Sequence, residues 1–196
     1  APTRPAPSPP GAADYKPEVG QQGKDVVWVP TSQALVNKML DMAKLTAADV
    51  HYDLGSGDGR TVITAAKRGG TATGIEYNPD MVELSRKNAA KEGVSDKAKF
   101  IQGDIFTQQS VDLYSKANVI TLFLLPDLNV KLRPNLLKMK PGSRIVSNTF
   151  TIAEWAPDDS ATADEKEGCN YYCKAYLWIV PAKAEGRWKM AQGELE

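Results

Sequence analysis

The segment that decides the fold runs from Val50 to Arg60 and reads VHYDLGSGDGR. An apolar strand ends around Asp53, and a turn follows with glycine at positions 55, 57 and 59. Because glycine has no Cβ, such a turn adopts unusual dihedral angles and lets a ligand approach its backbone closely. The helix that begins next directs free N–H groups at the same point. The segment therefore predicts a ligand pocket at the carboxyl edge of a sheet.

The glycine spacing narrows the class of ligand. Dinucleotide-binding turns read G-x-G-x-x-G, and their third glycine lets the helix pack closely. This turn reads G-x-G-x-G and continues with Arg60, so NAD and FAD are disfavoured. The turn also lacks the Gly-Lys-Ser/Thr ending of a P-loop, which argues against ATP hydrolysis.

A second acidic residue follows at the spacing expected for a ribose ligand. Glu76 stands 23 positions after Asp53, at the end of a second apolar run. A carboxylate about 20 residues after a glycine turn is placed to accept hydrogen bonds from both hydroxyls of a ribose. Asn78 is predicted to cap the next helix, with Pro79 in its first turn and Asp80 at the positive end of its dipole.

Three further elements continue the pattern. Residues 100–106 (FIQGDIF) predict a strand that ends near Asp104. Residues 119–129 (VITLFLLPDLN) predict an apolar strand that runs into a loop. Residues 136–146 (LLKMKPGSRIV) predict the end of a helix, a Pro-Gly turn and another strand.

Strands and helices are predicted to alternate along the whole chain. The first helix is expected over residues 32–44, where apolar residues have helical spacing. The expected parallel strands lie near residues 49–54, 72–76, 98–102, 118–123 and 143–149. Such alternation predicts an α/β fold, with a mostly parallel sheet covered by helices on both faces. Residues 174–180 and 187–190 are predicted to form an antiparallel hairpin at the end.

These elements, in this order and spacing, resemble the class I (Rossmann-like) S-adenosylmethionine (SAM)-dependent methyltransferases, over residues 26–190. The segment Val29-Pro30-Thr31, the glycine turn and the run Leu125–Asn129 (LPDLN) resemble those of a group of small bacterial methyltransferases. That group is itself similar to the mitochondrial lysine methyltransferases that modify the ATP synthase c subunit. The resemblance implies a Rossmann-like sheet of seven strands, mostly parallel, with a C-terminal antiparallel hairpin.

The resemblance also implies SAM as the cofactor and a set of residues that bind it. Asp53 and the glycine turn would hold the methionine end, Glu76 the ribose, and Asp104 the adenine amino group. Either Ile105 or Phe106 would lie beside the adenine ring. Thr31 would contact the cofactor from a segment folded over it, would cap the first helix, or would do both. The full cofactor-binding set predicted in this way is Thr31, Asp53, Gly55, Ser56, Gly57, Glu76, Tyr77, Asp104, Ile105 and Thr121. No catalytic base is identified, and no metal is expected.

The resemblance predicts methyl transfer to an acceptor nucleophile, with protein lysine as the candidate acceptor. After the fourth strand the chain reads Leu124-Leu125-Pro126-Asp127. Amide- and base-amino methyltransferases have Asp/Asn-Pro-Pro-aromatic there, so DNA adenine and protein glutamine are disfavoured. Two alternatives stay open: a small-molecule methyltransferase, and a SAM- or nucleoside-binding protein without transferase activity.

Composition agrees with one globular domain. The chain has 196 residues, of which 42% are hydrophobic. Its 24 basic and 24 acidic residues give a formal net charge of zero, so no basic excess favours nucleic acid as a partner. No uncharged apolar run reaches the roughly 18 residues of a transmembrane span. The oligomeric state stays open.

The first 25 residues differ from the rest. They are rich in proline, and such a segment buries too little apolar area to order itself, so residues 1–25 are predicted to be a flexible arm and residues 26–196 the methyltransferase domain. The arm is interpreted as a spacer, with a substrate-recognition role as the alternative. SAM availability favours the cytoplasm, whereas a Pro/Ala-rich N-terminus without Met is also typical of an exported protein.

The chain has two cysteines, Cys169 and Cys173. On an extended strand, residues four apart are separated by about 13 Å, which is too far for a disulfide. Two free thiols are therefore expected, unless a turn folds residues 170–172 back. With a single histidine in the chain, a zinc site is disfavoured. That histidine, His51, is on the first strand and is expected to be a buried or edge residue rather than a catalytic one.

Overall fold

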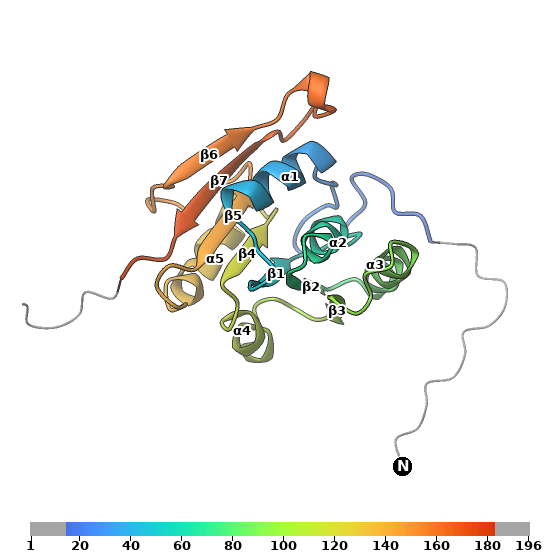
Figure 1. Ribbon diagram of the computed structural model, residues 1–196, viewed down its shortest axis with the longest axis horizontal. Helices are drawn as coiled ribbons and strands as arrows, with labels where there is room; N and C mark the ends of the chain where they lie inside the picture. The colour runs from blue at the N-terminus through green and yellow to red at the C-terminus, as the bar shows by residue number, and fades with distance from the viewer. Residues whose placement is uncertain (1–14, 183–196) are drawn as a thin grey trace, which may run out of the picture.

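The computed structural model describes residues 15–182 (Figure 1). Five α-helices, one short 3-10 helix and seven strands make up this part of the chain. In chain order they are α1 Gln33–Met42, β1 Val50–Leu54, α2 Arg60–Lys67, β2 Thr71–Glu76, α3 Pro79–Lys91, β3 Ala98–Gln102, α4 Gln108–Tyr114, β4 Val119–Leu122, α5 Pro126–Leu136, β5 Arg144–Asn148, β6 Asp159–Thr162, η1 Glu165–Glu167 and β7 Lys174–Ile179.

The strands form one sheet in the order β3-β2-β1-β4-β5-β7-β6. The strands β1 to β5 pair in parallel, whereas β7 pairs antiparallel with both β5 and β6. The strand order therefore reverses between β1 and β4, which is where open α/β sheets bind ligands. The predicted Rossmann-like sheet of seven mostly parallel strands is confirmed.

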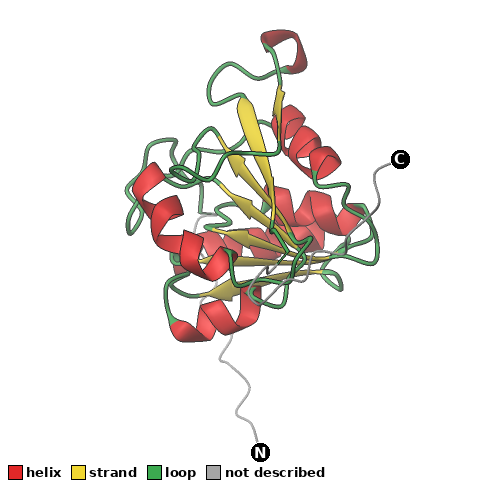
Figure 2. Cartoon of the chain, turned by 90° about the vertical axis from the view of Figure 1, so that its left-hand side faces the viewer, coloured by secondary structure: helices red, strands yellow, loops and turns green. Residues whose placement is uncertain are grey.

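Helices cover both faces of this sheet (Figures 1 and 2). The helices α1, α2 and α3 lie on one face, where Val36, Val62 and Val82 share a buried cluster with Phe100 of β3. The helices α4 and α5 lie on the other, where Tyr114 and Leu132 pack with residues of β1, β4 and β5. The central strand β4 (VITL) is buried at all four positions, as expected for a strand covered on both faces.

Capping side chains define where the helices begin. Asn78 caps α3, and its Oδ1 accepts hydrogen bonds from the N–H groups of Asp80 at 2.9 Å and Met81 at 3.4 Å, as predicted. The cap of α1 is Ser32, whose Oγ accepts from the N–H of Leu35 at 3.3 Å. The alternative interpretation of Thr31 as this cap is therefore wrong. Thr31 lies one residue too early, and its hydroxyl accepts from Asn148 Nδ2 at 3.1 Å.

The C-terminal hairpin is present, but its strands differ from the predicted pair. The partner of β7 in the hairpin is β6, which precedes it in the chain. Both edges of β7 are paired, one with β5 and the other with β6. The segment expected to be its partner, residues 187–190, lies outside the described residues. The four-residue strand β6 escaped prediction because it lacks an apolar face.

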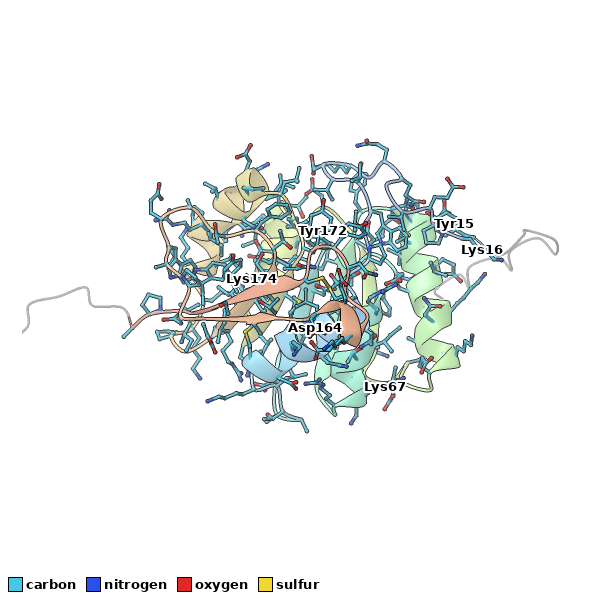
Figure 3. All side chains as sticks on the ribbon, turned by 90° about the horizontal axis from the view of Figure 1, so that it is seen from above. Tyr15, Lys16, Lys67, Asp164, Tyr172 and Lys174 are labelled. Carbon is cyan, nitrogen blue, oxygen red and sulfur yellow. A yellow bond between two sulfur atoms is a disulfide. The ribbon has the colours of Figure 1, made fainter. Side chains whose placement is uncertain are left out.

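The expectation of two free thiols is wrong, because Cys169 and Cys173 form a disulfide with a Cα–Cα distance of 5.8 Å. The cysteines precede β7 rather than lie on an extended strand, and the intervening residues turn back. Tyr172 has φ +55°, which turns the chain within this five-residue loop (Figure 3). Disulfides are typical of oxidising compartments, and the compartment of this protein stays a prediction.

No helix in residues 15–182 is long and apolar enough to cross a membrane. Within the same residues, no group of three or more His, Cys, Asp and Glu side chains is arranged to hold a metal ion.

Candidate active site

A cavity of about 360 Å³ opens at the carboxyl edge of the parallel strands. This volume is within the range of small-molecule sites. Nine of the ten predicted cofactor-binding residues line it: Thr31, Asp53, Gly55, Ser56, Gly57, Glu76, Tyr77, Asp104 and Ile105. The tenth, Thr121, is fully buried on β4 behind the cavity wall and reaches the site through Asp53.

The glycine turn forms the floor of the cavity. Gly57 has φ +54°, and a Cβ at this position would lie 2.7 Å from Trp28 Nε1. Only glycine fits this conformation and this close approach without strain. The hydroxyl of Ser85, on α3, donates to the Gly57 carbonyl at 2.8 Å, so the turn is held from the helix side as well.

Glu76 lies at the end of β2, beside the turn. Its carboxylate accepts hydrogen bonds from the N–H of Gly57 and the N–H of Asn78, both at 2.9 Å. One oxygen is used in each bond, and each oxygen has a second lone pair that can accept from a ligand. The backbone therefore orients Glu76 before any ligand binds.

Asp53 is the buried end of a hydrogen-bonded chain. The Thr121 hydroxyl donates to Asp53 Oδ1 at 2.6 Å, and His51 Nε2 lies 2.8 Å from the same hydroxyl oxygen. Since the hydroxyl has a single proton and gives it to Asp53, His51 is assigned as the Nε2–H tautomer that donates to Thr121. His51 is fully buried, as expected, and burial lowers its pKa to about 3, so the imidazole is neutral.

Burial raises the pKa of Asp53 to about 7, and the carboxylates of Glu76 and Asp58 add to this rise. The hydrogen bond from Thr121 acts in the opposite direction. A cationic ligand group would reverse the rise, because an adjacent positive charge favours the ionised carboxyl. Asp53 is thus suited to bind an ammonium group.

The Ser56 side chain packs against β2 and does not face the cavity. A Cβ at Gly74 would lie 2.4 Å from its hydroxyl oxygen, which is buried and has no hydrogen-bond partner among the described residues. The part of Ser56 that can line the cavity is therefore its backbone, within the glycine turn. The oriented carboxylates of Asp53 and Glu76 fit a ligand with an amino-acid end and a ribose.

Asp104 follows β3 and closes the cavity from the adenine side predicted for it. Its Oδ1 accepts from the N–H of Phe106 at 2.9 Å, and its Oδ2 pairs with Lys24 Nζ at 2.9 Å. The Lys24 ammonium is the main cause that lowers the pKa of Asp104, so this carboxyl is ionised at neutral pH. Lys24 also lies 5.5 Å above the ring of Tyr77.

The segment before α1 lies over the cavity. Residues 20–28 form a hairpin-like loop, in which the N–H of Gly20 donates to the Trp28 carbonyl at 2.8 Å. Residues 21–31 line the cavity without interruption. The guanidinium of Arg60 donates to the Thr31 carbonyl at 2.8 Å and to the Asp58 carboxylate, which ties this segment to the glycine turn. The boundary predicted at residue 25 divides this lining segment and stays a prediction.

Several residues that line the cavity were not predicted from the sequence. Three of them, Lys24, Trp28 and Arg60, do not lie at the ends of strands, where the binding residues were expected. Beyond β4 and β5, the rings of Phe123, Phe150 and Tyr172 also line the cavity, and each lies within 6.4 Å of the other two. No sequence pattern pairs these three aromatic residues, because they are far apart in the chain.

Comparison with known proteins identifies the family. Residues 53–159, more than half of the chain, match the family model described as the ANTKMT methyltransferase domain. The chain belongs to this methyltransferase family. The matched residues begin at Asp53 and include the glycine turn, Glu76 and Asp104. The prediction of a SAM-dependent methyltransferase is thereby confirmed.

Individual proteins similar to this ANTKMT-type methyltransferase are also methyltransferases. The chain is 39% identical to a protein-lysine N-methyltransferase of Saccharolobus islandicus, over 79% of this chain and 94% of the relative. It is 33% identical to the human lysine N-methyltransferase of the ATP synthase c subunit, over 67% of this chain and 54% of the relative. The chain thus spans about half the length of that second relative.

A solved structure shows the same fold. An RNA methyltransferase from Salinibacter ruber, in complex with S-adenosyl-L-homocysteine, superposes with a TM-score of 0.71 at 42% identity. The match covers 81% of this chain and 98% of that one. The ANTKMT-type fold described above therefore extends over nearly the whole of this structural relative.

Proposed function

We propose that this methyltransferase transfers the SAM methyl group to lysine side chains of proteins. The observation that carries the proposal is the division of the cavity into two chemically different ends. Carboxylates line the end at β1, β2 and β3, whereas Phe123, Phe150 and Tyr172 line the end at β4, β5 and β7. An apolar end that is open to the surface suits the aliphatic stem of a lysine.

The polar end matches the parts of SAM. Asp53 would accept hydrogen bonds from the methionine ammonium, and the backbone of the glycine turn at Gly55, Ser56 and Gly57 would contact the same amino-acid end. Glu76 would accept from the ribose hydroxyls and Asp104 from the adenine amino group, with Tyr77 and Ile105 beside them. Thr31 would close the site from the overlying segment, and Thr121 would orient Asp53. The sulfonium of SAM supplies an activated methyl group, so the protein has mainly to position and to exclude water.

The acceptor amine must be neutral before it can attack. Among the described residues, the apolar end of the cavity is lined by side chains without formal charge: Phe123, Leu124, Leu125, Leu128, Phe150 and Tyr172. An ammonium that enters this surrounding loses water, and desolvation lowers its pKa. The site would thereby favour the neutral amine without a dedicated carboxylate base.

The relative from Saccharolobus islandicus supports lysine as the acceptor class, since it is named a protein-lysine N-methyltransferase. The structural relative named as an RNA methyltransferase makes RNA the acceptor to be tested against it. The balanced charge of the chain, with 24 basic and 24 acidic residues, favours protein over RNA.

Methyl-labelled SAM tests the proposal. The enzyme is incubated with protein from the source cells, with the same protein after its lysines are acetylated, and with total RNA from those cells. The expected result is label in the untreated protein alone, recovered as Nε-methyl-lysine after hydrolysis. Equal labelling of acetylated protein, or label confined to RNA, would overturn it.

Variants connect this activity to the cavity. Glu76→Ala should abolish both labelling and the calorimetric signal of SAM binding, because it removes the carboxylate that binds the ribose hydroxyls. Glu165→Gln, which changes an exposed carboxylate of η1 outside the cavity, is the matched control and should retain both. Binding of SAM without labelling of any acceptor would instead favour a SAM-binding protein without transferase activity.

A further inference from the structure

The disulfide lies next to the apolar end of the cavity. Cys169 and Cys173 close a five-residue loop immediately before β7, and Tyr172 is inside that loop. Cys169 is 2% exposed, so one end of the bridge is anchored in the core, where it packs with Leu35 and Met39 of α1. The bridge therefore attaches Tyr172 to the body of the protein. Figure 3 draws the disulfide in yellow and labels Tyr172.

Tyr172 completes a surface formed by three aromatic rings, which we call the aromatic wall (Phe123, Phe150 and Tyr172). The ring centroids of Tyr172 and Phe123 are 5.4 Å apart and meet edge to face. Phe150 lies 6.4 Å from each of the other two. Phe123 follows β4 and Phe150 follows β5, so the three rings come from separate parts of the chain and meet only in the folded state.

The backbone that carries the wall is held in costly conformations. Tyr172 has φ +55°, and Thr149, which precedes Phe150, has φ +62°. A left-handed conformation is unfavourable for residues with a Cβ, and above all for a β-branched one, and such strain concentrates at functional sites. The N–H of Thr149 donates to the Lys174 carbonyl at 2.7 Å, which joins the end of β5 to the first residue of β7, directly after the disulfide loop.

A buried side-chain amide holds the backbone of the aromatic wall at Phe150. Asn129 of α5 donates from Nδ2 to the carbonyls of Phe150 at 3.2 Å and Thr151 at 3.3 Å. Asn129 is fully buried, so these bonds are not exchanged for water. Tyr172 keeps 46% of its surface exposed, so its ring is accessible to a partner at the mouth of the cavity.

We propose that the aromatic wall receives the acceptor lysine, and that the Cys169–Cys173 disulfide holds Tyr172 in place for it. The inference rests on the proposed function and names the residues that select the acceptor. The ring faces contact the aliphatic stem of the lysine. As the methyl group moves, positive charge develops on the acceptor nitrogen, and aromatic faces stabilise such a cation. The wall thus contributes where the charge arises in the transition state.

Reduction of the disulfide tests the second half of the proposal. A dithiol gives two electrons and two protons to the bridge: the S–S bond breaks, two thiols form, and the dithiol becomes a disulfide. The chain has only two cysteines, so no other bond responds. We expect the reduced enzyme to show a lower kcat/KM for the acceptor protein and an unchanged Kd for SAM. In the double variant Cys169→Ser/Cys173→Ser, the same effect should be present without reductant, and added dithiol should change nothing.

Variants of the loop test the aromatic contact itself, with the untreated cell-protein fraction as acceptor. Tyr172→Ala should lower kcat/KM for the acceptor about three- to thirtyfold, the range of a lost cation–π contact. Part of this loss should appear in kcat, because the positive charge on the acceptor nitrogen arises in the transition state. Tyr172→Phe keeps the ring and should stay near the wild type. Tyr171→Ala is the matched control, because Tyr171 is the neighbouring residue of the same loop, is 84% exposed and does not line the cavity.

The outcomes separate the inference from the function on which it rests. If the wild type binds SAM but methylates no lysine, the proposed function fails and the inference falls with it. If the wild type methylates lysine while Tyr172→Ala and the reduced enzyme keep the wild-type kcat/KM for the acceptor, the proposed function stands and the inference alone is overturned. A rise in the Kd for SAM in Tyr172→Ala would also contradict the inference, because it would assign Tyr172 to the cofactor.

Discussion

Asp53 and Thr121 are direct cross-strand partners on β1 and β4, and the Thr121 hydroxyl donates to the Asp53 carboxylate at 2.6 Å. The pair spans the two strands between which the strand order of the sheet reverses. His51, two residues earlier on β1, lies 2.8 Å from the same hydroxyl. A buried polar chain thus leads from the middle of the sheet to the cavity, and the protonation of its last member, Asp53, should control cofactor binding.

SAM affinity should depend on pH through Asp53. The pKa of this carboxyl is raised to about 7 by burial, and only the ionised form can pair with an ammonium group. Binding must therefore displace a proton below pH 7. We expect the Kd for SAM to rise about tenfold between pH 8 and pH 6, following the ionised fraction of the carboxyl. Calorimetric titration at both pH values measures this, and a Kd independent of pH would contradict the role of Asp53.

The same carboxyl should destabilise the unliganded protein at neutral pH. Its folded-state pKa of about 7 exceeds the value of 3.8 in an unfolded chain, so between these values the folded state binds the extra proton. Stability then falls as the pH rises through this window. Asp53→Asn, which is always neutral, should raise the Tm at pH 8 by at least about 2 °C. The exposed Asp96→Asn is the control, and scanning calorimetry without ligand is the measurement.

The close approach at Gly57 can be separated from backbone strain. Gly57→Ala places a Cβ 2.7 Å from Trp28 Nε1, whereas Gly142→Ala has a comparable positive φ of +85° with nothing within 4 Å. Both variants should lose about 1 kcal/mol or more of unfolding free energy from strain. Only Gly57→Ala should lose SAM binding, because it also displaces the segment over the cavity. Denaturant unfolding and calorimetry, applied to both proteins, test this; equal SAM affinities would show that the contact with Trp28 does not matter for the site.

The ion pair between Lys24 and Asp104 should slow the release of SAM. Its two side chains are partly exposed, with the nitrogen and oxygen 2.9 Å apart, so its contribution is modest. Lys24→Met should increase the dissociation rate of SAM by a factor of about five or less, and should remove the part of that rate that responds to salt. Stopped-flow measurements at two salt concentrations test this, with the exposed Lys16→Met as the control. If Lys24→Met released SAM at the wild-type rate and with the wild-type dependence on salt, the ion pair would have no role in retaining SAM.

Much of the site was predictable because parallel strands bring their carboxyl ends to one edge of the sheet. Asp53, Glu76 and Asp104 are each at or just beyond a strand end, so their convergence follows from the strand order. The wrong expectation of free thiols at Cys169 and Cys173 has an equally clear cause. Strand spacing was assumed across residues that in fact turn, and the left-handed Tyr172 that makes the turn carries no signal such as glycine.

The amino-acid sequence by itself determined the class of fold and the polar end of the cavity. Apolar runs, glycine positions and strand-ending acids are local features, and local features suffice when the geometry of a parallel sheet supplies the rest. Only the tertiary structure decided the aromatic wall, the pairing of Lys24 with Asp104, and the environment that raises the pKa of Asp53. Each of these depends on contacts between distant parts of the chain, and on the exclusion of water around them, which arise only when the layers pack together.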